Sequence, residues 1–327
     1  MKHLTIVVPN GQNNLSSIIG SYKFFSQANA LLVSKGKSPL FKIDLAGLSK
    51  NVKLYDGLFT ITPHKRITEI KKTNLIIIPA IHRSFSDNVQ KNARIIEWLN
   101  QQYKLGAEIA SICTGAFLLA STGLLNGKSC STHWNAEQPF TEMFPNVNLQ
   151  TGRLITDESR LYTNGGAFAF LHLLLYLVEK NYGRDIALMC AKIFQIDVAR
   201  SEQTMFTIFS AQKNHGDDVI LKVQKLIEEK ACDRMSIEEI ADKFALSRRN
   251  LDRRFINATG ITPLEYYQRV RIEHAKKVFE NRLEPVEEVM HKVGYSDPKT
   301  FREIFRKFTG LSPLEYRNFY NASRRMR

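Results

Sequence analysis

The chain has 327 residues, of which 43% are hydrophobic, and a formal net charge of +14 at pH 7. This length suggests two domains, and the composition is that of a globular protein able to build a core in each. No uninterrupted apolar run approaches the roughly 20 residues of a membrane helix, and the apolar stretch at residues 4–8 is too short for a signal peptide. We therefore expect a cytoplasmic protein with no membrane partner.

The four cysteines, Cys113, Cys130, Cys190 and Cys232, are scattered and form no CxxC pair. Neither a zinc site nor a disulfide framework is suggested, so we expect reduced thiols, no metal and no cofactor. The last three lie in apolar or mixed stretches and are expected to be buried small hydrophobic residues.

The positive charge favours a polyanionic partner, and its distribution adds detail. Arg predominates among the cations after residue 215, whereas Lys predominates before it. Arg makes bidentate contacts with guanine edges and phosphates that Lys cannot match. The second part of the chain is therefore the candidate for nucleic-acid binding, although charge alone leaves a merely basic surface as the alternative.

The first part of the chain alternates short β-rich runs with helical patterns. The predicted strands cover residues 4–8, 41–47, 57–61, 74–80, 107–113, 128–132, 153–156 and 160–163. The predicted helices cover residues 15–33, 88–104 and 165–183, with another directly after residue 113. Such alternation predicts an α/β domain over residues 1–196, a parallel sheet sandwiched between helices. The mostly polar residues 197–217 are expected to form a linker, and residues 218–327 an all-helical domain.

One thiol stands where a predicted strand meets a helix. Cys113 ends an apolar run and is followed by Thr114 and Gly115, then by small and apolar residues. Open α/β sheets bind ligands at this edge, and a helix N-terminus stabilises a thiolate or a bound anion. His133, followed by Trp134, comes twenty residues later and could complete a Cys–His pair, the minimum for nucleophilic catalysis. Trp134 either covers the pocket or simply packs.

The helix predicted from residue 165 offers a second group of N–H donors at the same cleft. Gly165 follows Asn164 and precedes Gly166, so the backbone can approach a ligand closely there. A tight turn that needs a positive φ explains the two glycines equally well.

An internal repeat dominates the second part of the chain. FINATGITPLEYY (255–267) and FRKFTGLSPLEYR (305–317) share one pattern at an offset of 50 residues. Before each copy, apolar residues at i, i+3, i+4 and i+7 mark one face of a helix, a short turn follows, and a second helix begins. The capping box at Ser236 and Glu239 and the Asp297-Pro298 pair support these boundaries. The unit of helix, tight turn and helix is the helix-turn-helix motif, and it occurs twice.

The outward faces of the two second helices carry the candidate DNA contacts. Leu251, Phe255, Phe301 and Phe305 are expected to point inward, which leaves polar and cationic residues outside. Side chains near the start of a recognition helix read base edges, and cations further along bind phosphate. The expected contacts are Ser247, Arg248, Arg249, Asp252 and Arg253 in the first unit, and Ser296, Lys299, Thr300, Arg302 and Arg306 in the second. A helical domain that binds protein through a solvated Arg surface is the alternative.

Residues 218–327 resemble the DNA-binding domain of AraC/XylS transcription regulators, and VGYSDPKTFREIFRKFTGLSPLEYR (293–317) is closely similar to that family's signature. The resemblance implies two helix-turn-helix subdomains that read adjacent major grooves of double-stranded promoter DNA. It also implies an effector or dimerisation domain on the N-terminal side.

The first part resembles the ThiJ/PfpI superfamily, which is related to the class I glutamine amidotransferases. Residues 110–134 and 162–183 carry the resemblance, which implies a flavodoxin-like sheet with the nucleophile-elbow cysteine at Cys113 and its partner at His133. The combination resembles the GlxA-like branch of AraC regulators. That branch implies a homodimeric transcription regulator rather than an enzyme, with a small-molecule effector and RNA polymerase as candidate partners.

One departure from the superfamily concerns the carboxylate that its enzymes place after the first strand. PNGQNNLSSIIGSYKFF (9–25) contains no Asp or Glu. We therefore expect a ligand pocket without turnover, lined by Cys113, Thr114, Gly115, His133, Trp134 and Gly165. A hydrolase or amidase, a redox-sensing thiol and inert packing remain as alternatives.

Overall fold

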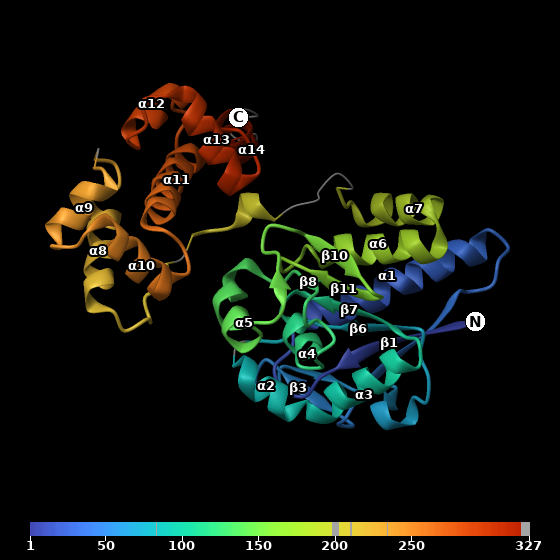
Figure 1. The fold of residues 1–327 in the computed structure, drawn as a ribbon. Coiled ribbons are helices and arrows are strands. Elements are labelled where there is room, and N and C mark those ends of the chain that lie inside the picture. Colours follow the sequence, from blue (N-terminus) through green and yellow to red (C-terminus); the bar gives the residue numbers. More distant parts are fainter. Residues whose placement is uncertain (83, 198–202, 210, 234, 322–327) are drawn as a thin grey trace. The chain divides into compact units, whose positions relative to one another are not determined.

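The computed structural model describes residues 1–82, 84–197, 203–209, 211–233 and 235–321 (Figure 1). The chain divides into two compact units, Met1–Gln203 and Thr204–Arg327. Residues 198–202 of the expected linker and residues 322–327 of the expected helical domain lie outside the described residues.

The first unit is built on a seven-stranded sheet in the order β10-β11-β7-β6-β1-β2-β5. All neighbouring strands run parallel except β10 and β11, so the predicted parallel sheet is confirmed. The strands are β1 (Lys2–Val8), β2 (Phe41–Gly47), β5 (Lys65–Arg66), β6 (Leu75–Ile78), β7 (Glu108–Ile112), β10 (Ile155–Glu158) and β11 (Leu161–Asn164). Two smaller sheets pair β3 (Val52–Leu54) with β4 (Phe59–Ile61) and β8 (Ser129–Cys130) with β9 (Asn148–Leu149).

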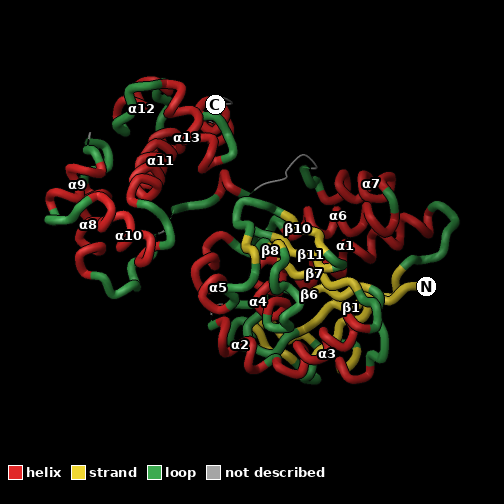
Figure 2. Tube along the Cα trace, in the orientation of Figure 1, coloured by secondary structure: helices red, strands yellow, loops and turns green. Residues whose placement is uncertain are grey.

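Helices cover both faces of this sheet, as Figure 2 shows. One face packs against α1 (Leu15–Ser34), α6 (Phe170–Tyr182) and α7 (Arg184–Phe194). The other packs against α3 (Ala93–Lys104), α4 (Ala116–Ala120) and α5 (Glu137–Met143), with α2 (Phe85–Lys91) beside them. Short 3₁₀ turns are η1 (Ile67–Glu69), η2 (Cys113–Gly115) and η3 (Trp134–Ala136).

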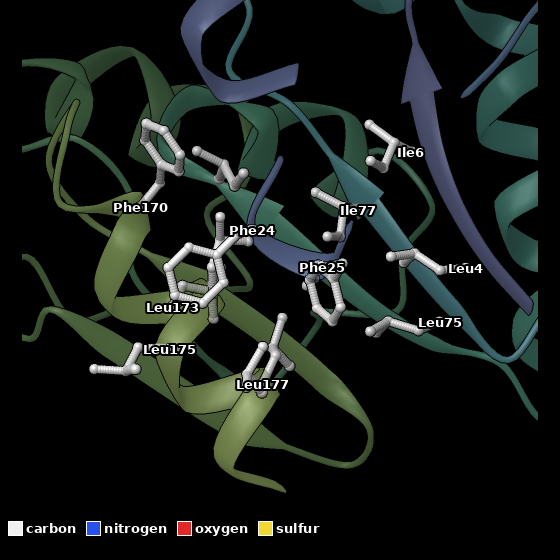
Figure 3. Close-up of a cluster of buried hydrophobic side chains, with 14 of the residues drawn as sticks. Leu4, Ile6, Phe24, Phe25, Leu75, Ile77, Phe170, Leu173, Leu175 and Leu177 are labelled. Atoms are coloured by element: carbon white, nitrogen blue, oxygen red, sulfur yellow. The ribbon is translucent and has the colours of Figure 1, made fainter. Parts of the chain in front are cut away.

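Alternation along the central strands creates two separate cores. Leu4 and Ile6 of β1 lie in the first core with Phe24 and Phe25 of α1 (Figure 3), whereas Val7 lies in the second. Successive side chains of a strand point to opposite faces, so a strand covered on both faces reads as a continuous apolar run.

The predicted helix over residues 88–104 is wrong in one respect, because it is two helices. The break falls at Asn92, whose φ is −112° and whose side chain is fully buried. Its carboxamide donates to the carbonyls of Asn10 and Asn88 and accepts from the Asn10 N–H. Asn side chains offer the backbone such alternatives to helical bonding, and the apolar stripe does not reveal them.

The second unit is helical throughout its described elements. These are η4 (Thr204–Phe206), α8 (Asp218–Glu229), α9 (Ile237–Lys243), α10 (Arg248–Thr259), α11 (Pro263–Asn281), α12 (Val286–Lys292), α13 (Pro298–Thr309) and α14 (Pro313–Asn321). The capping box at Ser236 is formed, and Asp297 caps α13 ahead of Pro298. Both predicted caps are confirmed.

Two cores lie side by side in this unit, one for each repeat. The first contains Leu251 and Phe255 of α10, and the second contains Phe301 and Phe305 of α13. The shared helix α11 contributes its first half to one core and its second half to the other. None of the helices in the described ranges is long and apolar enough to cross a bilayer.

Candidate functional sites

The two recognition helices present matching polar faces to solvent. Phe255 and Phe305 are fully buried, and the side chains at Arg249 and Lys299, which are equivalent in the repeat, are exposed. Ser247, Arg253, Ser296, Thr300, Arg302 and Arg306 are exposed as well, while Arg248 and Asp252 are partly buried. The helix α11, which joins the two helix-turn-helix units, has 19 residues, about 28 Å at the rise of an α-helix.

Several of these side chains already have partners inside the protein. The Arg248 guanidinium contacts Asp252 at 3.0 Å and Glu238 at 2.7 Å. The Thr300 hydroxyl donates to Asp297 at 2.6 Å, and Arg306 lies 3.6 Å from Glu315. Among the described residues, Arg249, Lys299 and Arg302 have no ion pair.

One arginine of α10 is paired with a carboxylate at the start of α8. Arg254 makes a bidentate contact with Asp217, at 3.0 and 2.6 Å. Asp217 is also the N-cap of α8, where it accepts from the N–H groups of Val219 and Ile220. The hydrogen bond from Arg254 holds the pKa of Asp217 below its usual value. This carboxylate therefore fastens the recognition helix to the start of the helical bundle.

The second candidate site is the carboxyl edge of β7 and β11, which lie side by side (Figure 1). Ile112 and Asn164 are register partners, so Cys113 and Gly165 follow at the same edge. Cys113 has φ +53°, a left-handed conformation rare for a residue with a side chain. A Cβ at Gly115 would lie 2.6 Å from the Pro79 carbonyl oxygen, so only glycine fits the turn. The chain thus forms the sharp elbow that the ThiJ/PfpI resemblance implies at Cys113.

Polar contacts tie this elbow to its surroundings. The Thr114 hydroxyl donates to the Ile81 carbonyl at 2.6 Å and accepts from the Ile81 N–H at 3.1 Å. The Thr132 hydroxyl donates to the Cys113 carbonyl at 3.0 Å. The segment that carries His133 is therefore held against the elbow.

The thiol and the imidazole are not hydrogen-bonded to each other. Nδ1 of His133 accepts from the Asn135 N–H at 3.1 Å, and its ring lies 5.3 Å from the Trp134 ring. Burial raises the pKa of Cys113 to about 11, and burial lowers the pKa of His133. Near pH 7 both the thiol and the imidazole are neutral, so Cys113 lacks the thiolate that a nucleophile requires.

The place after β1 holds amides instead of a carboxylate. Asn13 is fully buried and donates to the carbonyls of Pro9 and Gly11, while its Oδ1 has no partner among the described residues. An amide cannot accept the thiol proton. Cys130 and Cys190 are buried as expected, whereas the prediction for Cys232 is wrong: it is exposed, 3.6 Å from His274. It lies in the turn after α8, where the apolar pattern has ended.

The sequence gives no indication of one further residue at this edge, Gln203. Its side chain is buried against Gly165, and its amide nitrogen lies 3.1 Å from the Thr132 carbonyl oxygen. It comes from the mostly polar stretch expected to be a linker, where no periodicity marks a buried position.

Two family models match the chain, one in each unit. A model described as "Helix-turn-helix domain" matches residues 240–318, and the DJ-1/PfpI family model matches residues 29–180. The chain joins an AraC-type helix-turn-helix domain to a DJ-1/PfpI domain. The family resemblance drawn from the sequence is thereby confirmed.

Curated relatives share this architecture. The chain is 26% identical over 223 residues to the HTH-type transcriptional regulator GbdR of Pseudomonas aeruginosa, a match that covers 68% of this chain and spans 60% of GbdR. It is 26% identical over 220 residues to the HTH-type transcriptional regulator GlxA of Rhizobium meliloti, covering 66% of each. The crystal structure of Drosophila melanogaster DJ-1beta is 18% identical with a TM-score of 0.50, covering 60% of this chain and 98% of that one, and shows the flavodoxin-like fold.

Proposed function

We propose that this protein is a sequence-specific transcription regulator. Its helical unit binds double-stranded promoter DNA, and its α/β unit senses a small molecule or mediates homodimer formation. RNA polymerase is a further candidate partner. Such a regulator works beside the chromosome, so we propose the cytoplasm as its location.

One observation carries the DNA-binding proposal: two helix-turn-helix units share α11, and both recognition helices expose cations at the same repeat position. The length of α11, about 28 Å, is close to one turn of B-DNA, about 34 Å. A protein-binding helical domain would not need two cationic faces at this spacing. Ser247, Arg249, Arg253, Ser296, Lys299 and Arg302 are the proposed contacts with bases or phosphates, together with Arg248, Asp252, Thr300 and Arg306.

Selection from a random duplex library tests this proposal. We expect enrichment of a motif with two short elements about one helical turn, or roughly 10 base pairs, apart. The variant Arg249→Ala should blur one element, and Lys299→Ala the other. Enrichment of no motif, or of a single element that neither variant affects, contradicts the proposal.

For the α/β unit we propose a ligand pocket without turnover at the edge formed by Cys113, Thr114, Gly115, His133, Trp134 and Gly165. The neutral thiol, the imidazole that bonds to Asn135 and not to the thiol, and the missing carboxylate support binding over nucleophilic catalysis. Residues 197–217 are proposed to transmit ligand occupancy to the DNA-binding unit by shifting the population of binding-competent molecules.

The variant Cys113→Ser separates the remaining candidates for this edge. If the protein is a hydrolase or amidase, this variant would lose turnover of amide and ester substrates. If the edge only binds a ligand, the wild type would show no turnover and the variant would keep the DNA affinity of the wild type. A redox switch would show peroxide-sensitive DNA binding in the wild type and none in the variant. We expect unchanged DNA affinity and no peroxide effect that depends on Cys113.

A further inference from the structure

The side chain of Gln203 fills a polar slot at the ligand-binding edge proposed above. The residue is 1% exposed, and its Nε2 lies 3.1 Å from the Thr132 carbonyl, 3.3 Å from the Arg153 carbonyl and 3.4 Å from the Ser131 hydroxyl oxygen. Its backbone N–H donates to the Gly152 carbonyl at 3.1 Å. Gln203 is therefore held by its main chain and by its side chain.

The slot is lined by hydrogen-bond acceptors. Two of the three oxygens are carbonyls, and the Ser131 hydroxyl donates its own proton to the Arg153 carbonyl at 2.6 Å. All three oxygens therefore accept from the group that occupies the slot. The NH₂ group of the Gln203 carboxamide has two hydrogens for these three oxygens, and its Oε1 is buried with no partner among the described residues. A group with donors alone, such as an ammonium, or an amide with its oxygen free to reach water, fits the slot better than Gln203 does.

Gln203 lies at the boundary between the two compact units of the chain. It is the last residue of the first unit, and Thr204 begins the second. The residues that follow are held inside the second unit. The Phe206 ring packs edge-on against Phe319, and Nζ of Lys276, which is 3% exposed, donates to the Thr207 carbonyl. The anchor in the slot is therefore one peptide bond away from a segment fixed to the helical bundle.

We propose that Gln203 is an internal plug of the effector site. A small molecule with an ammonium or primary amide head displaces the Gln203 carboxamide from Thr132, Ser131 and Arg153 and so releases the tether between the two units. This mechanism deepens the proposed sensor role and rests on it. Effector and tether compete for the same oxygens, so ligand binding and tether docking exclude each other.

Gly165 supplies a test that leaves Gln203 itself unchanged. A Cβ on Gly165 would lie 1.9 Å from Nε2 of Gln203, and its three closest contacts are all atoms of that side chain. The far end of a flexible side chain moves at little cost, so Gly165→Ala should expel the plug without unfolding the unit. Gln203→Ala removes the same contact from the other side. The matched control is Gln101→Ala, an exposed glutamine of α3.

Hydrogen exchange on the full chain without DNA measures release of the tether. We expect peptides covering residues 203–209 to exchange about tenfold faster in Gly165→Ala and in Gln203→Ala than in the wild type, while Gln101→Ala stays unchanged. The double variant should match either single variant, because both remove one contact. If both single variants exchange at the wild-type rate, the proposal that Gln203 anchors this segment is wrong. Because no DNA is present, this result is independent of whether the helical unit binds DNA.

A binding experiment tests the slot itself. We titrate acetamide and, separately, methylammonium chloride at constant ionic strength into the wild type and Gln203→Ala, and follow the amide resonances of Thr132 and Gly165. We expect saturable shifts with at least one probe in Gln203→Ala, and an affinity about tenfold weaker in the wild type, where the plug competes. Equal affinity in the two proteins, or no saturable shift in Gln203→Ala, overturns the proposal that the slot is a ligand site.

Discussion

The two helix-turn-helix units share one backbone plan but differ in how freely their cations can move. In the first, Arg248 is paired with Glu238 and Asp252, and Arg254 with Asp217. In the second, the residue equivalent to Arg254 is Ile304, which packs against the core. Among the described residues, the first recognition helix therefore holds two arginines in ion pairs within the protein, whereas the second holds one, Arg306 with Glu315. A repeated fold can keep its backbone plan while the ion pairs on its surface change.

The turns of the two helix-turn-helix units also differ in their backbone conformation. Ala245 of the first turn has φ +52°, and Gly294 of the second has φ +84°. A Cβ at Gly294 would lie 2.7 Å from the Arg271 guanidinium, which donates to the carbonyls of Ala231 and Asp233. The second turn thus makes room for an arginine that ties α11 to the turn after α8. The first turn stores backbone strain instead.

Removing a buried aromatic ring should unfold one helix-turn-helix unit and leave the other folded. Phe255→Ala and Phe305→Ala each delete a fully buried side chain, at a cost of about 3–5 kcal/mol. Because the two cores are separate, we expect exchange protection to be lost in α8–α10 for the first variant and in α12–α14 for the second. Hydrogen exchange measures this, with the exposed Ile256→Ala as control. Loss of protection throughout by either variant would mean that the two units fold as one.

Substitution of the turn residues should act in opposite directions. Gly294→Ala meets both an unfavourable φ and the Arg271 guanidinium, so we expect it to destabilise the chain by about 1–3 kcal/mol. Ala245→Gly relieves a strained φ and should be neutral or stabilise by up to about 1 kcal/mol. Urea unfolding measures both. Equal destabilisation by the two variants would contradict this assignment of strain.

Arginines of the two recognition helices should differ in the kind of DNA binding that they support. We expect Arg249→Ala to cost about 1–3 kcal/mol on the selected sequence and little on random DNA. Arg306→Ala should weaken both alike and reduce the slope of log affinity against log salt by about 1. Fluorescence anisotropy at several salt concentrations measures this, and Lys225→Ala, a 75% exposed cation on α8, is the control. Identical profiles for the two variants would contradict the different roles proposed for Arg249 and Arg306.

The ion pair between Asp217 and Arg254 should give the first helix-turn-helix unit a small contribution to stability that is lost in acid. The folded-state pKa of Asp217 is lowered, so this contribution is present above the unfolded pKa, about 3.9, and is lost as pH falls through the folded pKa. Asp217→Asn keeps an N-cap but removes the charge. We expect it to cost less than about 1 kcal/mol at pH 7, and the difference from wild type to shrink below about pH 4. Urea unfolding at pH 7 and pH 3 measures this; a difference that grows in acid would contradict the assignment.

Much of the fold could be read from local patterns. Apolar runs predict the central strands because both faces of the sheet are covered, and the caps at Ser236 and Asp297 predict helix starts because they depend only on nearby residues. The repeat predicts two helix-turn-helix units for the same reason. The break at Asn92 escaped prediction because its partner, Asn10, is 82 residues away.

The amino-acid sequence by itself determined the two-domain plan, the doubled helix-turn-helix unit and the strand–helix junction at Cys113, because each depends on spacing along the chain. Only the tertiary structure decided that Arg248 and Arg254 are held in ion pairs, that His133 bonds to its own turn instead of the thiol, and that Gln203 fills a slot of acceptor oxygens. Those outcomes depend on which groups from distant segments come within about 3 Å, a distance that no periodicity encodes.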